Sequence, residues 1–206
     1  MTEASRNLAI FDFDGTLIRG DSFIPYLFCV YLSSLLLAPR RFVSISLRLP
    51  KIIKNSASHL RGTIDARSLK EMLLSAFIEG LTVTYVNRIS RLFCKLITRL
   101  ARKEIVQSLR ELKRQGYITV LVSASPDLYL KEIRDIFGFD FLMSTKAEIV
   151  DDRVTGKIIG ENCKGVEKLR RLREVFTESE IKNAISYADD ESDTPLMEIV
   201  RKPIWI

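Results

Sequence analysis

Hydrophobic runs alternate with amphipathic segments along most of this chain. Short apolar runs bounded by turn residues predict strands, namely NLAIFDF, YITVLVSAS, FDFLMS, NAISYAD and a final PIWI. Periodic apolar positions predict helices over residues 104–116, from Pro126 to about Phe137, over KGVEKLRRLREVF and over DTPLMEIVR. The segment AEIVDDRVTGKII has the pattern of a hairpin. This order is typical of an α/β fold, a mostly parallel sheet flanked by helices.

One long segment interrupts the alternation. Residues 22–103 show helical periodicity and few strand signals, so we predict a helical segment inserted after the first strand. The domain boundaries follow from it. Residues 1–20 and 104–206 would form the α/β core, and residues 21–103 would form a small helical cap.

Polar side chains lie where three of the predicted strands end. Asp12 and Asp14 end the first strand, Ser123 ends the second, and Asp189 follows the fourth. In open parallel sheets, ligands bind beyond the carboxyl ends of the strands. We therefore expect these side chains to meet at one edge of the sheet.

Asp12 and Asp14 place two negative charges close together. Both side chains start on the same side of the strand, where they repel each other unless a cation lies between them. Mg²⁺ suits this position because it commonly takes one or two carboxylates together with a substrate phosphate. Gly15 permits a sharp exit from the strand, and Thr16 offers a hydroxyl and a backbone N–H to an anion. On these residues alone, a strand-end turn with capping acids is the alternative.

Four motifs, in order along nearly the whole chain, resemble the haloacid dehalogenase superfamily. They are DFDGT from Asp12 to Thr16, the serine of LVSAS, the lysine of CKGVEK, and the acidic pair Asp189 and Asp193 in YADDESD. The resemblance implies a Rossmann-like, mostly parallel sheet. The insertion after the first motif resembles the small cap of the phosphoserine-phosphatase-like branch, subfamily IB.

The resemblance also implies an activity, the Mg²⁺-dependent hydrolysis of a phosphomonoester through an aspartyl-phosphate. Asp12 would be the nucleophile, and Asp14 would act as general acid and then as base. Mg²⁺ would be held by the Asp12 carboxylate, the Asp14 backbone carbonyl and Asp189. Asp193 would orient the metal shell. Ser123 would donate a hydrogen bond to a phosphoryl oxygen.

Further substrate contacts are implied in the same way, at Gly15, Thr16, Asp21 and Ala124. Asp21 stands where phosphoserine phosphatases carry a glutamate that touches the substrate. The shorter acid weakens the case for phosphoserine as the substrate.

Two lysines compete for the third motif. Lys164 and Lys168 are four residues apart, and therefore lie on one helical face. Phosphoserine phosphatases place the lysine just before the glycine, which indicates Lys164. A subgroup with the pattern Cys-x-Gly-x-x-Lys indicates Lys168. We favour Lys168 and expect the other lysine to be solvated.

Charge is distributed unevenly along the chain. Residues 19–103 hold 15 Lys and Arg against 4 Asp and Glu, a net charge of +11, and the rest of the chain carries −5, which together give +6. The basic part could face anionic lipid, nucleic acid or an anionic substrate, or could be a solvated surface. No nucleic-acid motif is recognised, so no nucleic-acid partner is expected.

The cysteines and the N-terminus bear on the compartment. Three widely spaced cysteines argue against a disulfide framework and favour a reducing, cytoplasmic setting. The first residues lack a basic segment followed by an apolar core, so a secretory signal is not expected.

The apolar stretch after the first motif has several interpretations. Residues 22–38 are 17 residues without a charge, followed by Arg40 and Arg41, and this length is at the lower limit of a membrane span. A single span would separate the first motif from the others. A buried cap helix, a membrane-surface helix with basic flanks and a re-entrant hairpin remain. In the second case, residues 22–54 would bind an anionic membrane at its inner face.

Two further functions share the same motifs. A phosphotransferase would use every residue named above. A membrane-surface lipid phosphate phosphatase would differ in its leaving group, and the order of apolar and basic segments loosely resembles a bacterial phosphatidylglycerophosphate phosphatase.

Two other functions fit the sequence less well. A haloacid dehalogenase would lack the second acid, so Asp14 argues against it. A response-regulator-like domain would not carry so long an insertion.

Overall fold

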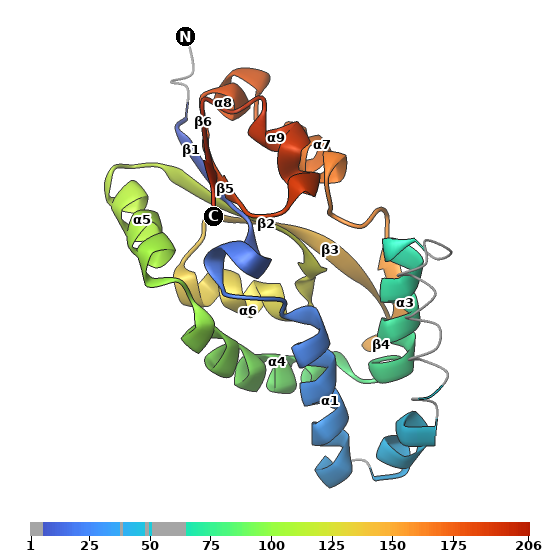
Figure 1. The fold of residues 1–206 in the computed structure, drawn as a ribbon. Helices are drawn as coiled ribbons and strands as arrows, with labels where there is room; N and C mark the ends of the chain where they lie inside the picture. The colour runs from blue at the N-terminus through green and yellow to red at the C-terminus, as the bar shows by residue number, and fades with distance from the viewer. Residues whose placement is uncertain (1–5, 38, 48–49, 51–64) are drawn as a thin grey trace.

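A six-stranded sheet forms the centre of the computed structural model, which describes residues 6–37, 39–47, 50 and 65–206 (Figure 1). Its strand order is β4-β3-β2-β1-β5-β6. Neighbouring strands are parallel except for the antiparallel pair β3 and β4. The strands are β1 (Leu8–Phe11), β2 (Ile118–Pro126), β3 (Phe141–Val150), β4 (Arg153–Ile159), β5 (Ile185–Ala188) and β6 (Lys202–Trp205). The predicted α/β fold with a mostly parallel sheet is confirmed.

Helices cover both faces of this sheet because the side chains of a strand point alternately to its two sides. In β1, Leu8 and Ile10 join one buried hydrophobic cluster, whereas Ala9 and Phe11 join the other. The first cluster includes residues of α7 (Val166–Arg173), α8 (Glu178–Lys182) and α9 (Thr194–Met197). The second includes residues of α5 (Lys103–Arg114), α6 (Asp127–Phe137) and the inserted helices.

The insertion is helical over its described residues, as expected. It contains α1 (Phe23–Leu37), a helix over residues 39–47, α3 (Ala66–Phe77) and α4 (Val83–Ile97), followed by the short turn η2 (Thr98–Leu100). Its two ends lie side by side, because the Arg19 N–H donates to the Leu100 carbonyl at 3.0 Å and the Arg102 N–H donates to Leu17 at 2.9 Å. The cap boundaries at residues 21 and 103 stay a prediction.

Two local differences from the predicted elements have clear causes. Strand β3 runs on to Val150, so that the third predicted strand and the first half of the hairpin are one strand, which turns back at Asp151 and Asp152. The helix α8 was not predicted. It begins at a capping box, in which the side chains of Thr177 and Glu180 each bond the other's backbone N–H.

The apolar stretch of the insertion does not form a membrane-spanning helix. Within the described part of the chain, no helix is both long enough and apolar enough to cross a bilayer. One side of α1 is buried against α4, where the Tyr26 hydroxyl bonds Ser90 at 2.9 Å. Three of the basic residues considered for membrane contact, Arg48, Lys51 and Lys54, lie outside the described residues.

Candidate active site

The chain leaves β1 through a tight turn, η1 (Phe13–Leu17), which positions the two acids of the first motif. The Asp12 N–H donates to the Tyr187 carbonyl at 3.0 Å, so that Asp12 still extends the sheet. Gly15 has a φ of +74°, and a Cβ there would lie 1.8 Å from Oδ2 of Asp189. The turn therefore needs glycine both for its backbone conformation and for the close approach of the Asp189 carboxylate.

Lys168 forms the cationic centre of the site. Its Nζ donates to Oδ1 of Asp12 at 2.8 Å and to Oδ2 of Asp193 at 2.7 Å, and all three side chains are at least nine-tenths buried. Burial alone would lower the pKa of Lys168, but the two carboxylates raise it above its ordinary value. Burial raises the pKa of Asp12 to about 7, against the opposing effect of Lys168. The lysine therefore stays charged between two acids.

Asp14 has different hydrogen-bond partners from Asp12, a backbone N–H and a hydroxyl. Its Oδ1 accepts from the Ser22 N–H at 2.7 Å, and its Oδ2 accepts from the Ser125 hydroxyl at 2.6 Å. Burial raises the pKa of Asp14, and the hydrogen bonds from the two serines oppose that rise. A carboxyl group with a raised pKa holds its proton more tightly than a solvated one, which suits a general acid.

Of the acidic residues of the fourth motif, Asp193 is buried, whereas Asp189, which lies beside the turn η1, and Asp190 are exposed. Oδ1 of Asp189 accepts from the Thr16 hydroxyl at 3.0 Å. Asp193 is buried on Lys168, and its Oδ1 has no hydrogen-bond partner among the described residues. Asp190 is exposed and forms an ion pair with Lys164 at 3.3 Å. The structure thus brings Lys168, and not Lys164, onto Asp12.

The chain after β2 supplies the opposite wall. Ser123 is buried, and its hydroxyl oxygen accepts from the Ser125 N–H at 3.0 Å. The Ala124 carbonyl accepts from the Thr145 hydroxyl at 2.6 Å and from Nζ of Lys70. Lys70 comes from α3 and also donates to Oδ1 of Asn162 at 2.6 Å.

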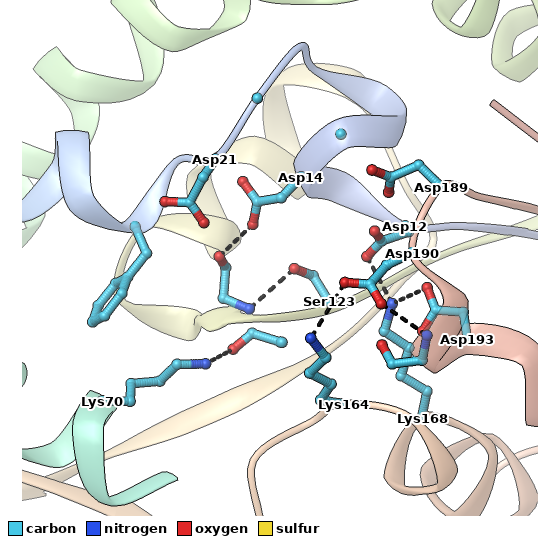
Figure 2. A pocket seen from close by; sticks show the side chains of 16 residues that line it. Asp12, Asp14, Asp21, Lys70, Ser123, Lys164, Lys168, Asp189, Asp190 and Asp193 are labelled. Atoms are coloured by element: carbon cyan, nitrogen blue, oxygen red, sulfur yellow. Dashed lines mark hydrogen bonds and ion pairs between the residues drawn. The ribbon is translucent and has the colours of Figure 1, made fainter. Parts of the chain in front are cut away.

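A cavity of about 410 Å³ opens between these elements (Figure 2). In the close view, Lys168 and Asp193 lie at one end, and Asp21 and Lys70 lie at the other. The residues from the predicted site that line it are Asp12, Asp14, Gly15, Asp21, Ser123, Ala124, Lys164, Lys168, Asp189 and Asp193. Thr16 is fully buried behind them, with its hydroxyl on Asp189.

Among the lining residues that the sequence did not single out, Ser125 and Lys70 bond other groups of the cavity wall. Ser125 holds Asp14, and its only sequence signal is its place two residues after Ser123. Lys70 belongs to the insertion, and burial lowers its pKa to about 8. No local pattern distinguishes it from the other basic residues of that segment.

The oxygen atoms of this cavity fit a hard divalent cation. No three His, Cys, Asp or Glu side chains are grouped as a metal cluster in the described part of the chain. A Mg²⁺ site does not need three, because Mg²⁺ is commonly bound by one or two carboxylates together with water and substrate phosphate. The buried Oδ1 of Asp193, which lacks a described partner, and the carboxylates of Asp12 and Asp189 at the cavity wall supply hard oxygen donors.

Comparison with known proteins gives a consistent result. A family model described as haloacid dehalogenase-like hydrolase matches residues 9–198. Protein CicA of Caulobacter vibrioides is 31% identical over 194 residues, which cover 93% of this chain and 82% of the relative. The phosphoserine phosphatase of Methanocaldococcus jannaschii is 23% identical over 187 residues, covering 87% and 77% of the two chains.

Solved structures share the fold. A protein with unknown function from Bordetella pertussis Tohama I has a TM-score of 0.77 at 24% identity, over 98% of this chain and 90% of that one. A structure named as the phospho-aspartyl intermediate analogue of phosphoserine phosphatase has a TM-score of 0.59 at 20% identity, over 98% and 87%.

Proposed function

The chain belongs to the haloacid dehalogenase-like hydrolase family, and from this we propose that it is a Mg²⁺-dependent phosphatase that hydrolyses phosphomonoesters through an aspartyl-phosphate. One observation carries the proposal. Two carboxylates share one cavity, but Asp12 is held by a lysine, whereas Asp14 is held by hydroxyl and N–H donors. Carboxylates in such different environments are suited to different roles.

Asp12 is the nucleophile in this proposal. A carboxylate oxygen of Asp12 attacks phosphorus, the bond from phosphorus to the leaving oxygen breaks, and that oxygen takes a proton from Asp14. Water then attacks the aspartyl-phosphate and gives a proton to Asp14, while the bond between phosphorus and Asp12 breaks. Phosphate is released, and both acids return to their starting states.

The environment of Asp14 supports its role as acid and base. Burial raises its pKa, which keeps a proton available for the leaving group. The Ser22 N–H and the Ser125 hydroxyl fix both of its oxygens at 2.7 and 2.6 Å, so that its orientation does not depend on the substrate. We therefore assign Ser125 as a positioning residue for Asp14.

Lys168 and Ser123 would stabilise the transferred phosphoryl group. Lys168 lies 2.8 Å from the nucleophile, where its charge offsets the repulsion between the carboxylate and an incoming phosphate. Ser123 lines the same cavity from the end of β2. Gly15 and Ala124 line the wall between them, and Thr16 acts through Asp189. This arrangement favours Lys168 over Lys164 as the lysine of the third motif.

The cation would be held by the Asp12 carboxylate, the Asp14 carbonyl and Asp189, with Asp193 beside them. When bound, Mg²⁺ supplies positive charge where an anionic nucleophile meets an anionic substrate. Asp189 is already positioned by the Thr16 hydroxyl and by the glycine that it approaches.

A phosphotransferase of the same superfamily is the alternative function, because it would share all of these residues. It would deliver the phosphoryl group to an acceptor hydroxyl instead of water. Competition between water and added alcohols, measured as the ratio of free phosphate to new ester, separates the two.

The first experiment measures hydrolysis of a generic aryl phosphate with Mg²⁺ and with EDTA. We expect activity in Mg²⁺ and none in EDTA, and full activity of the metal-free protein would exclude the metal role. Acid quenching with ³²P-labelled substrate should trap label on the wild type and none on Asp12→Asn. The exposed Asp135, paired with Arg134 on α6, provides the matched control Asp135→Asn. Label trapped on Asp12→Asn would rule out Asp12 as the nucleophile.

The leaving group is then sought by screening phosphate release from small phosphate esters, nucleotides and lipid phosphates. Phosphoserine is included because several relatives are named phosphoserine phosphatase. Asp21 lines the distal end of the cavity and is the acid that faces the leaving group in this proposal.

A further inference from the structure

Helix α1 has one buried side and one exposed apolar side. Tyr26, Leu27 and Val30 are at most 1% exposed, and this side packs on the rest of the protein. On the other side, Ile24, Phe28, Leu32 and Leu36 follow one another at intervals of four residues, with exposures from 45% to 84%. Residues at this spacing form one continuous stripe on a helix. An apolar stripe facing solvent is unusual and marks an interaction surface.

Exposed apolar side chains continue into the next helix, over residues 39–47. Val43 and Leu47 are 55% and 79% exposed. This helix is fixed on α1, since the Tyr31 ring stacks on Phe42 at 4.6 Å and the Tyr31 hydroxyl bonds Ser46 at 2.7 Å. We call the six exposed side chains of the two helices the apolar ridge; they are Ile24, Phe28, Leu32, Leu36, Val43 and Leu47.

The ridge protrudes and begins beside the candidate active site. Figure 1 shows α1 and residues 39–47 extending away from the sheet. At the other end of α1, Asp21 and Phe23 line the cavity, and Ile24 is the next residue along the chain. Whatever covers the ridge would therefore lie close to the cavity entrance.

The charge around the ridge indicates what covers it. The sequence has no Asp or Glu between Asp21 and Asp65. Arg40 is exposed in the first turn of the helix over residues 39–47. If a second copy of the chain covered the ridge, two segments of net positive charge would lie against each other, and their repulsion would oppose such a dimer. A convex ridge with basic flanks instead matches a helix that lies in the interface of an anionic bilayer.

We propose that the apolar ridge docks onto the surface of a bilayer that contains anionic lipid, with the cavity opening next to that surface. The binding itself is independent of the reaction. Only its consequence, better access to phosphomonoesters carried by lipids, rests on the proposed phosphatase function.

The test uses the full chain and vesicles of two compositions, pure phosphatidylcholine and phosphatidylcholine mixed with phosphatidylglycerol. We expect co-sedimentation with the anionic vesicles, and weaker binding as salt rises from about 50 mM to about 500 mM, because the electrostatic attraction is screened. Phe28→Ser combined with Leu36→Ser should lower the partition coefficient at least about tenfold, because two apolar side chains are lost.

A matched double variant controls for the loss of exposed apolar surface elsewhere. Ile136→Ser combined with Val175→Ser removes side chains that are 45% and 44% exposed on the α/β core. It should bind vesicles as the wild type does. None of these four residues lines the candidate active site, so both double variants should keep the wild-type rate with a soluble aryl phosphate. That rate also shows that each variant is folded.

Three results would overturn the proposal. The wild type could stay in the supernatant with anionic vesicles, or the ridge variant could bind as well as the control variant. Light scattering could also show a dimer of the wild type that the ridge variant loses, which would make a second copy the occupant. If the wild type does not hydrolyse the aryl phosphate, the proposed phosphatase function is refuted, but the vesicle-binding and light-scattering results still test the docking proposal.

Discussion

Replacing Lys168 by methionine removes the only described positive charge that bonds the nucleophile candidate. The side chain is 5% exposed and lies 2.8 Å from Asp12 and 2.7 Å from Asp193. Lys168→Met would leave these two buried carboxylates without their shared partner. Breaking a buried ion pair in this way costs about 3–5 kcal/mol. The exposed pair of Lys164 and Asp190, at 3.3 Å, is worth no more than about 1 kcal/mol.

The two variants should therefore differ clearly in thermal stability. For a chain of this length, each kcal/mol lowers the melting temperature by about 2–4 °C. Lys168→Met should then melt roughly 6–20 °C below the wild type, whereas Lys164→Met should change little. Circular dichroism in EDTA measures both. In Mg²⁺, Lys168→Met should also lower kcat/KM by about 10²–10³-fold, the usual effect of losing one positioned charge or donor.

The destabilisation should depend on pH in a defined direction. Burial raises the pKa of Asp12 to about 7 and also raises that of Asp193. Without Lys168, both values rise further, so that the folded variant binds more protons than the unfolded chain. Its stability must then fall as pH increases from about 5 to about 8. Two results would refute this account. Lys168→Met and Lys164→Met could have equal melting temperatures at pH 8, or Lys168→Met could lose more stability relative to the wild type at pH 5 than at pH 8.

Three further predictions rest on other contacts. Gly15→Ala should lower the activity about 100-fold, because the new Cβ displaces the Asp189 carboxylate. Gly20 has a similar φ of +80°, but a Cβ there would have no atom within 4 Å, so Gly20→Ala should lose much less activity. Glu180→Gln should lower stability by about 1–2 kcal/mol at pH 7. Arg6 holds the pKa of Glu180 down to about 2, so this difference should be full above about pH 4.5 and vanish as pH falls toward 2 in denaturant titrations. Lys70→Met should lower kcat/KM about tenfold, because the Ala124 carbonyl and Asn162 lose their shared donor; unchanged kinetics would exclude a role for Lys70.

The residues themselves determined the fold class and the edge of the sheet where the cavity lies. Short apolar runs mark most of the strands, and three of these runs are followed by a polar residue, namely Asp12, Ser123 and Asp189. Parallel pairing brings the carboxyl ends of strands to one edge whatever the details of packing. These positions line the cavity as the pattern predicts.

Only the tertiary structure decided between positions that the local pattern leaves equivalent. The sequence pattern places Lys164 and Lys168 on one helical face, but α7 begins at Val166, so Lys164 precedes the helix. Lys168 is buried on Asp12, whereas Lys164 stays exposed and pairs with Asp190. Lys70 reaches Ala124 across 54 residues of sequence, and Ser125 reaches Asp14 across 111. The apolar stretch of α1 divides into a buried side and an exposed ridge only when α4 covers one of them. Local sequence encodes periodicity and residue type, whereas burial and distant contacts depend on how the whole chain packs.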